Sequence, residues 1–162
     1  MKNILSKIAG LIVFAIVLLS ISACGGDEQK AADFSKTKSV ANDPNAGLSQ
    51  FELENGIGPV KQKLELGPID PKLVKKGEEI FNTKCIACHK LDERYVGPAQ
   101  RDVIKRRTPE FIMNMMLNPL EMQEKHPVVK KLLAEYMTQM TNQNLSFDDA
   151  RAILEYFREI GK

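Results

Sequence analysis

The chain has 162 residues, with 23 Lys and Arg against 21 Asp and Glu, which gives a formal net charge of +2 at pH 7. A balance so close to neutral excludes a protein that binds nucleic acid through a large excess of positive charge. Only three cysteines and two histidines are present, so a four-ligand zinc site would need four of these five side chains.

The first 23 residues have the pattern of a secretory signal peptide. Lys2 and Lys7 precede an unbroken apolar run over residues 8–19, which is too short for a comfortable membrane span. The sequence Ile21-Ser22-Ala23-Cys24-Gly25 then resembles the lipobox of bacterial lipoproteins. This resemblance implies that the Cys24 thiol receives a diacylglycerol and becomes the first mature residue. An ordinary cleaved signal and an uncleaved anchor are the alternatives, but both leave an odd free thiol in an oxidising compartment.

The lipobox resemblance also predicts the location of the mature protein. Two or more acyl chains hold a protein to a bilayer stably, where a single chain does not. We therefore expect a protein of the bacterial cell envelope, anchored to a membrane through Cys24 and facing the periplasm. Residues 24–47 are rich in small and polar residues and show no apolar period, which predicts a flexible linker.

Residues 48–69 combine large apolar side chains with helix-breaking residues. The breaks at Gly56, Gly58-Pro59 and Gly67-Pro68 argue against a helix. The apolar content nevertheless indicates that the segment lies on another surface. We expect an extended arm, packed on the following domain or on a partner.

Residues 70–162 predict an all-α domain of about four helices. Asp70-Pro71 provides an N-cap followed by proline at the first helical position, and opens a helix that runs towards Cys85. Thr108-Pro109 repeats this signal and opens a Met-rich helix that should end near Asn118-Pro119. Pro127 begins a third helix, and a capping box from Ser146 opens the last one. No alternating apolar run is long enough to predict a sheet.

Cys85-Ile86-Ala87-Cys88-His89 is a covalent haem attachment motif. Two thiols at this spacing can add across the two vinyl groups of one haem, and His89 then supplies an axial imidazole to the iron. A thioredoxin-like site would need βαβ surroundings, and a Cys85–Cys88 disulfide would leave His89 unexplained. One covalent haem c would also supply the apolar mass that so small a domain lacks.

With these motifs, residues 70–162 resemble a class I c-type cytochrome with a single haem. The resemblance implies that Gly77 and Phe81 cross closely with the last helix, near Glu155-Tyr156-Phe157. It also implies that the carbonyl of Pro98, in the Gly97-Pro98 pair, accepts a hydrogen bond from the His89 imidazole and so fixes its tautomer.

The sixth iron ligand has to be chosen among the methionines that follow the haem motif. Three of them lie within the predicted Met-rich helix, where methionine is usually a core residue. Met140 instead lies in a loop before the Ser146 cap, which resembles the methionine loop of the family, although Thr141 stands where proline is frequent. We expect Met140 to be the ligand, with Met137 and Met122 as alternatives. His126, which precedes Pro127, is expected to be a surface residue.

A haem with two axial protein ligands favours one-electron transfer over catalysis, so the chain is predicted not to be an enzyme. Its partners would be a quinol-oxidising complex or another cytochrome as donor, and a terminal reductase or oxidase as acceptor. Residues 48–162 also resemble lipoprotein cytochromes that accompany nitrous oxide reductase. Two alternatives remain: a haem enzyme or gas sensor with an open sixth site, and a fixed subunit of a larger redox complex.

The basic cluster Arg101, Lys105, Arg106 and Arg107 has two interpretations. It is either a solvated face or a site for partner docking or haem propionates.

The lipid anchor can be tested through Cys24. We expect Cys24→Ser to block signal cleavage or to release the protein from membranes, because serine offers no thiol for the acyl group. Membrane fractionation and the mass of the mature protein measure both effects. A normally processed Cys24→Ser protein that stays on membranes would contradict the lipobox interpretation.

Overall fold

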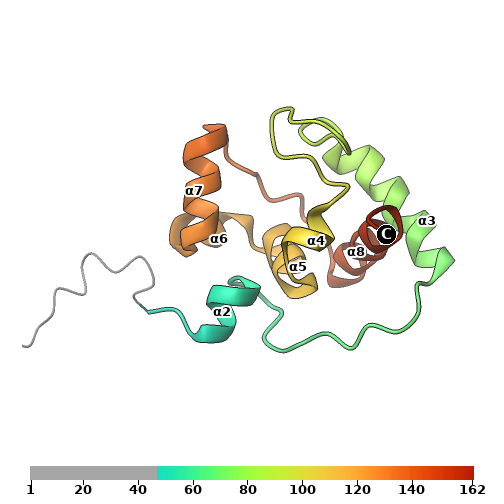
Figure 1. Cartoon of the computed structure of the whole chain (residues 1–162), viewed down its shortest axis with the longest axis horizontal. Coiled ribbons are helices and arrows are strands. Elements are labelled where there is room, and N and C mark those ends of the chain that lie inside the picture. The colour runs from blue at the N-terminus through green and yellow to red at the C-terminus, as the bar shows by residue number, and fades with distance from the viewer. Residues whose placement is uncertain (1–46) are drawn as a thin grey trace, which may run out of the picture. The chain divides into compact units, whose positions relative to one another are not determined.

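In the computed structural model of the protein, residues 47–162 are described. Cys24, the predicted signal peptide and nearly all of the predicted linker lie outside these residues. All regular elements of the described part are helical, which confirms the all-α fold class (Figure 1). They are α2 (Gln50–Asn55), α3 (Pro71–Ile80), the π-helical segment Phe81–Cys85, α4 (Val103–Arg106), α5 (Pro109–Leu117), α6 (Pro119–Lys125), α7 (Pro127–Tyr136) and α8 (Phe147–Ile160). Within residues 47–162, no helix has the length and apolar content needed to cross a membrane.

Three of the predicted helix starts are present with their capping side chains. Asp70 accepts a hydrogen bond from the Lys72 amide before α3, and Thr108 accepts one from the Phe111 amide at the start of α5. Ser146 and Asp149 form the reciprocal capping box of α8. These contacts are local in sequence, which is why the residue pattern alone predicts them.

Two short helices, α4 and α6, are additional to the four that the sequence predicts. The Met-rich helix α5 does end at Leu117, but Pro119 also starts a new helix, α6, as its first residue. Proline suits a first helical position because the amide hydrogen that it lacks would have no partner there. The sequence analysis interpreted Pro119 only as the end of α5, and for this reason it missed helix α6.

The sequence analysis expected an extended arm over residues 48–69, but part of this arm is helical. Its first part is helix α2, capped by Ser49 and Glu52 in a capping box that the glycine-based argument overlooked. The helix ends at Gly56, whose φ of 79° favours glycine. The chain from there to Asp70 has no regular structure and runs along the domain (Figure 1).

Asn114 on α5 fastens the arm to the domain. This fully buried side chain accepts a hydrogen bond from the Val60 amide at 2.9 Å and donates to the carbonyl oxygens of Val60 and Asn55, both at 3.0 Å. A Cβ atom on Gly58 would overlap the Asn114 side chain. The arm therefore packs on this domain, one of the two positions predicted for it.

Helices α3 and α8 cross at very close range, side by side in Figure 1. A Cβ atom on Gly77 would overlap the carbonyl group of Ala152. Phe81, at the end of α3, packs against two rings of α8, with centroids 5.8 Å from both Tyr156 and Phe157. Both aromatic residues are thus partners of Phe81, a choice that the sequence left open.

Glu155 anchors the same face of α8 to the start of α3. Its side chain is fully buried, pairs with Arg158 at 2.9 Å and with Arg151, and accepts a hydrogen bond from the Asp70 amide at 2.9 Å. Burial by itself would raise the pKa of Glu155, but these hydrogen bonds outweigh it and lower that pKa below its ordinary value. The carboxylate is therefore a charged, fully paired group within the crossing.

We expect Gly77→Ala to lower the free energy of unfolding by about 1–3 kcal/mol, because its methyl group would push α3 away from the Ala152 backbone. Chemical denaturation of the purified protein with its cofactor bound measures this change. Gly67→Ala is the matched control, since a Cβ atom there meets no atom within 4 Å. Equal effects of the two changes would contradict a steric requirement at the crossing.

Candidate functional site

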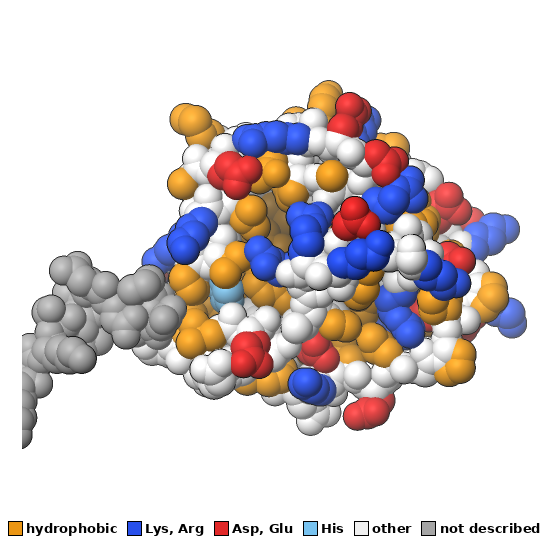
Figure 2. Space-filling model, in the orientation of Figure 1, with side chains coloured by type: hydrophobic (Ala, Val, Ile, Leu, Met, Phe, Trp, Pro, Cys, Tyr) orange, Lys and Arg blue, Asp and Glu red, His pale blue; other side chains and the backbone are white. Residues whose placement is uncertain are grey.

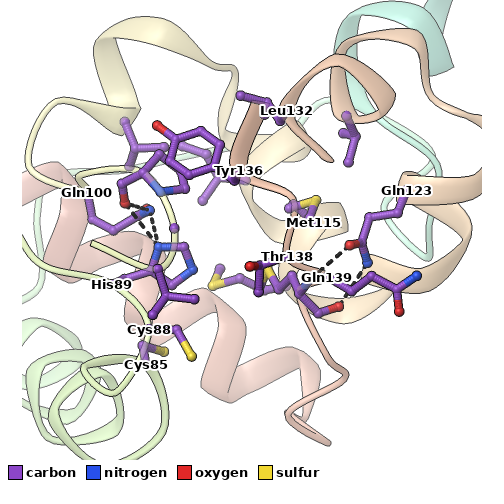
Figure 3. A pocket seen from close by; sticks show the side chains of 18 of the residues that line it. Cys85, Cys88, His89, Gln100, Met115, Gln123, Leu132, Tyr136, Thr138 and Gln139 are labelled. Carbon is purple, nitrogen blue, oxygen red and sulfur yellow. Dashed lines mark hydrogen bonds between the residues drawn. The ribbon is translucent and has the colours of Figure 1, made fainter. Parts of the chain in front are cut away.

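A cavity of about 380 Å³ brings together most of the residues that the sequence singled out. Cys85, Cys88 and His89 line this cavity, and Met140 lines it as well. The remaining walls come from residues 96–100, the helices α4, α5, α6, α7 and α8, and the loop before α8; Figure 3 shows part of this lining. Most of the lining is apolar and includes Phe81, Val96, Phe111, Ile112, Met115, Met116, Val129, Leu132, Leu133 and Phe157.

The two thiols lie at the end of the π-helical segment that follows α3 and just after it. After the π-helical segment, the amides of Cys88 and His89 both donate to the Cys85 carbonyl, at 3.0 and 2.9 Å. Cys85 and Cys88 are free and form no disulfide. Burial raises the pKa of the Cys85 thiol to about 11, whereas a thioredoxin-like cysteine has a lowered pKa. The burial of the Cys85 thiol and the lack of a Cys85–Cys88 disulfide therefore disfavour both redox alternatives for the motif.

The His89 ring is held from behind by Gly97 and Pro98. Its Nδ1 atom lies 3.0 Å from the Pro98 carbonyl oxygen, the contact that the family resemblance implied. A Cβ atom on Gly97 would overlap the imidazole, so glycine is required at that position. Burial lowers the pKa of His89 against the opposing effect of the Pro98 hydrogen bond, which favours the neutral ring. When Nδ1 carries the proton and donates to Pro98, Nε2 keeps its lone pair for a metal.

Gln100 is a further neighbour of His89 that sequence reasoning did not identify. Its Nε2 atom donates to the Pro98 carbonyl oxygen at 2.8 Å (Figure 3). Nε2 also lies 2.9 Å from His89 Nδ1, but it forms no hydrogen bond there when Nδ1 carries the proton, because both groups are then donors. The side chain is buried, so little water competes for these contacts. Gln100 therefore helps to fix the carbonyl that orients the imidazole. Nothing in the local sequence pattern distinguishes this glutamine from a surface residue.

The methionines considered as a second axial ligand occupy different environments. Met140 is half-buried and lines the cavity. Met137 ends α7 in a left-handed conformation and is 87% exposed. Met122 is fully buried, does not line the cavity, and accepts a hydrogen bond at its sulfur from the Ile57 amide at 3.0 Å. The geometry thus favours Met140 among the three. Met115 and Met116 of α5 also line the cavity.

His126 is not the surface residue that the sequence analysis expected. Its side chain is fully buried and packs edge-on against Phe111, with ring centroids 5.1 Å apart. Nδ1 accepts a hydrogen bond from the Val128 amide as the cap of α7, and Nε2 lies 3.2 Å from the Leu53 carbonyl oxygen. Both ring nitrogens are engaged, so His126 is a structural residue that joins α7 to the arm.

The basic cluster divides between the cavity and the surface. Arg106 and Arg107 line the cavity, together with Lys84. Arg101 pairs with Asp92, and Lys105 pairs with Asp102 at 3.3 Å. On the face in Figure 2, hydrophobic side chains are recessed in a hollow with several Lys and Arg side chains around it. Part of the cluster is therefore placed to meet anionic groups at the cavity.

A metal centre built from protein ligands alone is not supported. In the part of the chain from residue 47 onward, no group of three or more His, Cys, Asp or Glu side chains is arranged to hold a metal ion. An apolar cavity with two free thiols, one oriented imidazole and a thioether instead fits a haem attached through Cys85 and Cys88.

Comparison with known proteins agrees with this geometry. Residues 74–161 match the family model described as Cytochrome c. The cytochrome c from Rhodothermus marinus is 54% identical, with a TM-score of 0.65 over 74% of this chain and 97% of its own. An engineered form of it is 53% identical, with a TM-score of 0.64 over 74% and 98% of the two chains.

A third solved structure is that of the engineered Rhodothermus marinus cytochrome c bound to a carbene intermediate. It is 52% identical, with a TM-score of 0.62 over 74% of this chain and 98% of its own. No curated protein gives a significant match. The family match spans more than half of the chain and includes the whole attachment motif. The chain therefore belongs to the cytochrome c family, whose members carry covalently bound haem c.

Proposed function

We propose that this electron-carrying haem protein is a membrane-tethered monohaem cytochrome whose iron is ligated by His89 and Met140. The observation that carries the haem-ligation part of the proposal is that Cys85, Cys88, His89 and Met140 line one and the same cavity. Haem c bound there supplies one iron that alternates between the ferrous and ferric states, and so carries one electron at a time.

Each residue of the motif has a separate role in this proposal. Cys85 and Cys88 would hold the haem, each through a thioether formed when its S–H group adds across one vinyl group. His89 donates through Nε2, while Pro98 holds the proton on Nδ1 and so fixes the tautomer and orientation of the ring. The attachment and the first axial ligand thus come from five consecutive residues.

Met140, in the loop between α7 and α8, would supply the second axial ligand. A thioether is a soft, weak donor that stabilises ferrous iron and raises the reduction potential. If His89 and Met140 both bind the iron, no position on it would stay open for substrate or water. Electron transfer then requires little movement of the ligands, which suits a carrier rather than a catalyst.

The tether and the partners form the second part of the proposal. A lipid on Cys24 and a linker over residues 24–47 would keep the haem domain near a membrane. Encounter with membrane-bound partners would then depend on effective concentration rather than on bulk diffusion. The donor would be a quinol-oxidising complex or another cytochrome. The acceptor would be a terminal reductase or oxidase, of which nitrous oxide reductase is one candidate through the family resemblance.

A haem enzyme with an open sixth site is the second candidate function. The observation in its favour is that an engineered form of the related cytochrome is bound to a carbene intermediate. The related protein can thus, after engineering, hold a small reactive group. Met140 at the cavity of this chain favours the electron carrier.

Covalent attachment predicts that haem stays with the polypeptide. We expect haem staining of the protein band after denaturing electrophoresis, and no haem release by acid-acetone extraction, because thioethers survive both treatments. Cys85→Ala combined with Cys88→Ala should release the haem. Haem that is extracted from the parent protein would contradict the attachment by Cys85 and Cys88.

Axial ligation by Met140 predicts a spectroscopic change. Met140→Ala should remove the near-infrared sulfur-to-iron band of the ferric protein, lower the reduction potential and let the ferrous protein bind carbon monoxide, because the thioether is lost. Absorption spectra and redox titration measure these effects.

Met137→Ala is the matched control for this change and should preserve the band, because the Met137 side chain is exposed. A band that survives Met140→Ala would refute the ligand assignment. A parent protein that lacks the band and binds carbon monoxide readily would favour the enzyme or sensor.

A further inference from the structure

The segment between α7 and α8 carries Met140 without support from regular structure. Residues 137–146 form neither helix nor strand, so their backbone groups need partners elsewhere. Met137 and Asn144 both adopt the left-handed conformation, with φ of 52° and 50°. The position of Met140 therefore depends on the contacts that other segments make with this loop.

Gln123 on α6 binds both backbone polar groups of Met140. Its Oε1 atom accepts a hydrogen bond from the Met140 amide at 2.9 Å, and its Nε2 atom donates to the Met140 carbonyl oxygen at 2.8 Å (Figure 3). Nε2 also donates to the Pro119 carbonyl oxygen at 2.8 Å. A flipped amide would place Oε1 against two carbonyl oxygens, so these contacts define its orientation.

Gln123 is buried, which strengthens its hydrogen bonds to the Met140 backbone. Only 7% of Gln123 is exposed, so water competes little for its three hydrogen bonds. The neighbouring Met122 is fully buried and accepts a hydrogen bond from the Ile57 amide of the arm. Helix α6 is thus fixed between the arm on one side and the Met140 loop on the other, which gives Gln123 a rigid base.

We propose that Gln123 is a positioning residue for the sixth haem ligand: by pinning the Met140 backbone, it slows dissociation of the Met140 sulfur from iron. This inference rests on the proposed function of Met140 as the ligand. An iron–thioether bond is weak and re-forms at once unless the sulfur moves away, so lasting release requires the Met140 segment to swing away from the iron. A backbone pinned by Gln123 raises the barrier to that movement, because the two hydrogen bonds to Met140 have to break first.

Gln123 therefore controls how often the sixth site opens to external ligands. The hydrogen bonds between Gln123 and Met140 affect only the Met140 ligand, and they leave the attachment through Cys85 and Cys88 unchanged. In a Gln123 variant the Met140 sulfur would still bind iron at equilibrium, but the rate at which it is released would rise.

The test measures the rate at which imidazole replaces the sixth ligand in the ferric, haem-loaded full chain. At saturating imidazole this rate equals the rate of sulfur release, and loss of the near-infrared band reports it. We expect Gln123→Leu to raise the limiting rate about tenfold, as the loss of two hydrogen bonds implies, while the band stays present without imidazole. If the Leu variant does not fold, Gln123→Asn serves instead, because its side chain is one methylene too short to hold both Met140 groups.

Two controls separate positioning from general stability. Gln50→Leu makes the same chemical change on the exposed side of α2, where the Gln50 side chain donates to Glu54 and does not line the cavity. Asp70→Ala lowers stability by removing the cap at the start of α3, and Asp70 does not line the cavity either. Both should keep the parent rate to within about twofold, a change of less than one hydrogen bond. An unchanged rate in the Gln123 variants, or an equal rise in Asp70→Ala, would overturn the inference. A band that survives Met140→Ala would instead refute the ligand assignment itself.

Discussion

The close crossing of α3 and α8 is the contact on which the site depends. Gly77 lets the backbones approach at Ala152, and Phe81 then packs between Tyr156 and Phe157. The attachment motif begins at Cys85, the last residue of the π-helical segment that continues α3, and the Met140 loop leads directly into α8. One crossing therefore sets the relative positions of the segments that carry both proposed axial ligands. A glycine, with no side chain to separate the helices, is what makes so short a separation feasible.

The arm supports the Met140 side of the cavity, although it lies outside the family match. Residues 74–161 are 88 of the 162 residues, whereas the Rhodothermus marinus cytochrome c covers 74% of the chain, so the similarity extends in front of residue 74. In the structure, Asn114 binds the arm to α5, and Met122 binds it to α6. Because α6 also carries Gln123, the arm is mechanically linked to the Met140 loop.

The cavity combines an apolar interior with a few oriented polar groups. His89 is held by Pro98 and Gln100, and the Met140 backbone is held by Gln123. Neutral amide and carbonyl groups make these contacts, so they orient the ligands without placing charge beside the iron site. Three of the four charged side chains that line the cavity are basic, namely Lys84, Arg106 and Arg107, and the fourth is Glu135. Such a site can keep its ligands in place while the charge of the iron changes by one.

The sequence by itself determined the attachment motif, the all-α class and the helix starts at Asp70, Thr108 and Ser146, because each depends on contacts within a few residues. It also singled out Met140 through its place before a cap. Only the tertiary structure decided that His126 is buried, that the arm begins with a helix, and that Gln100 and Gln123 serve the site. These features depend on partners far along the chain: the Leu53 carbonyl lies 73 residues from His126, and Met140 lies 17 from Gln123. Such distant pairs leave no local pattern, since their geometry exists only once the helices have packed.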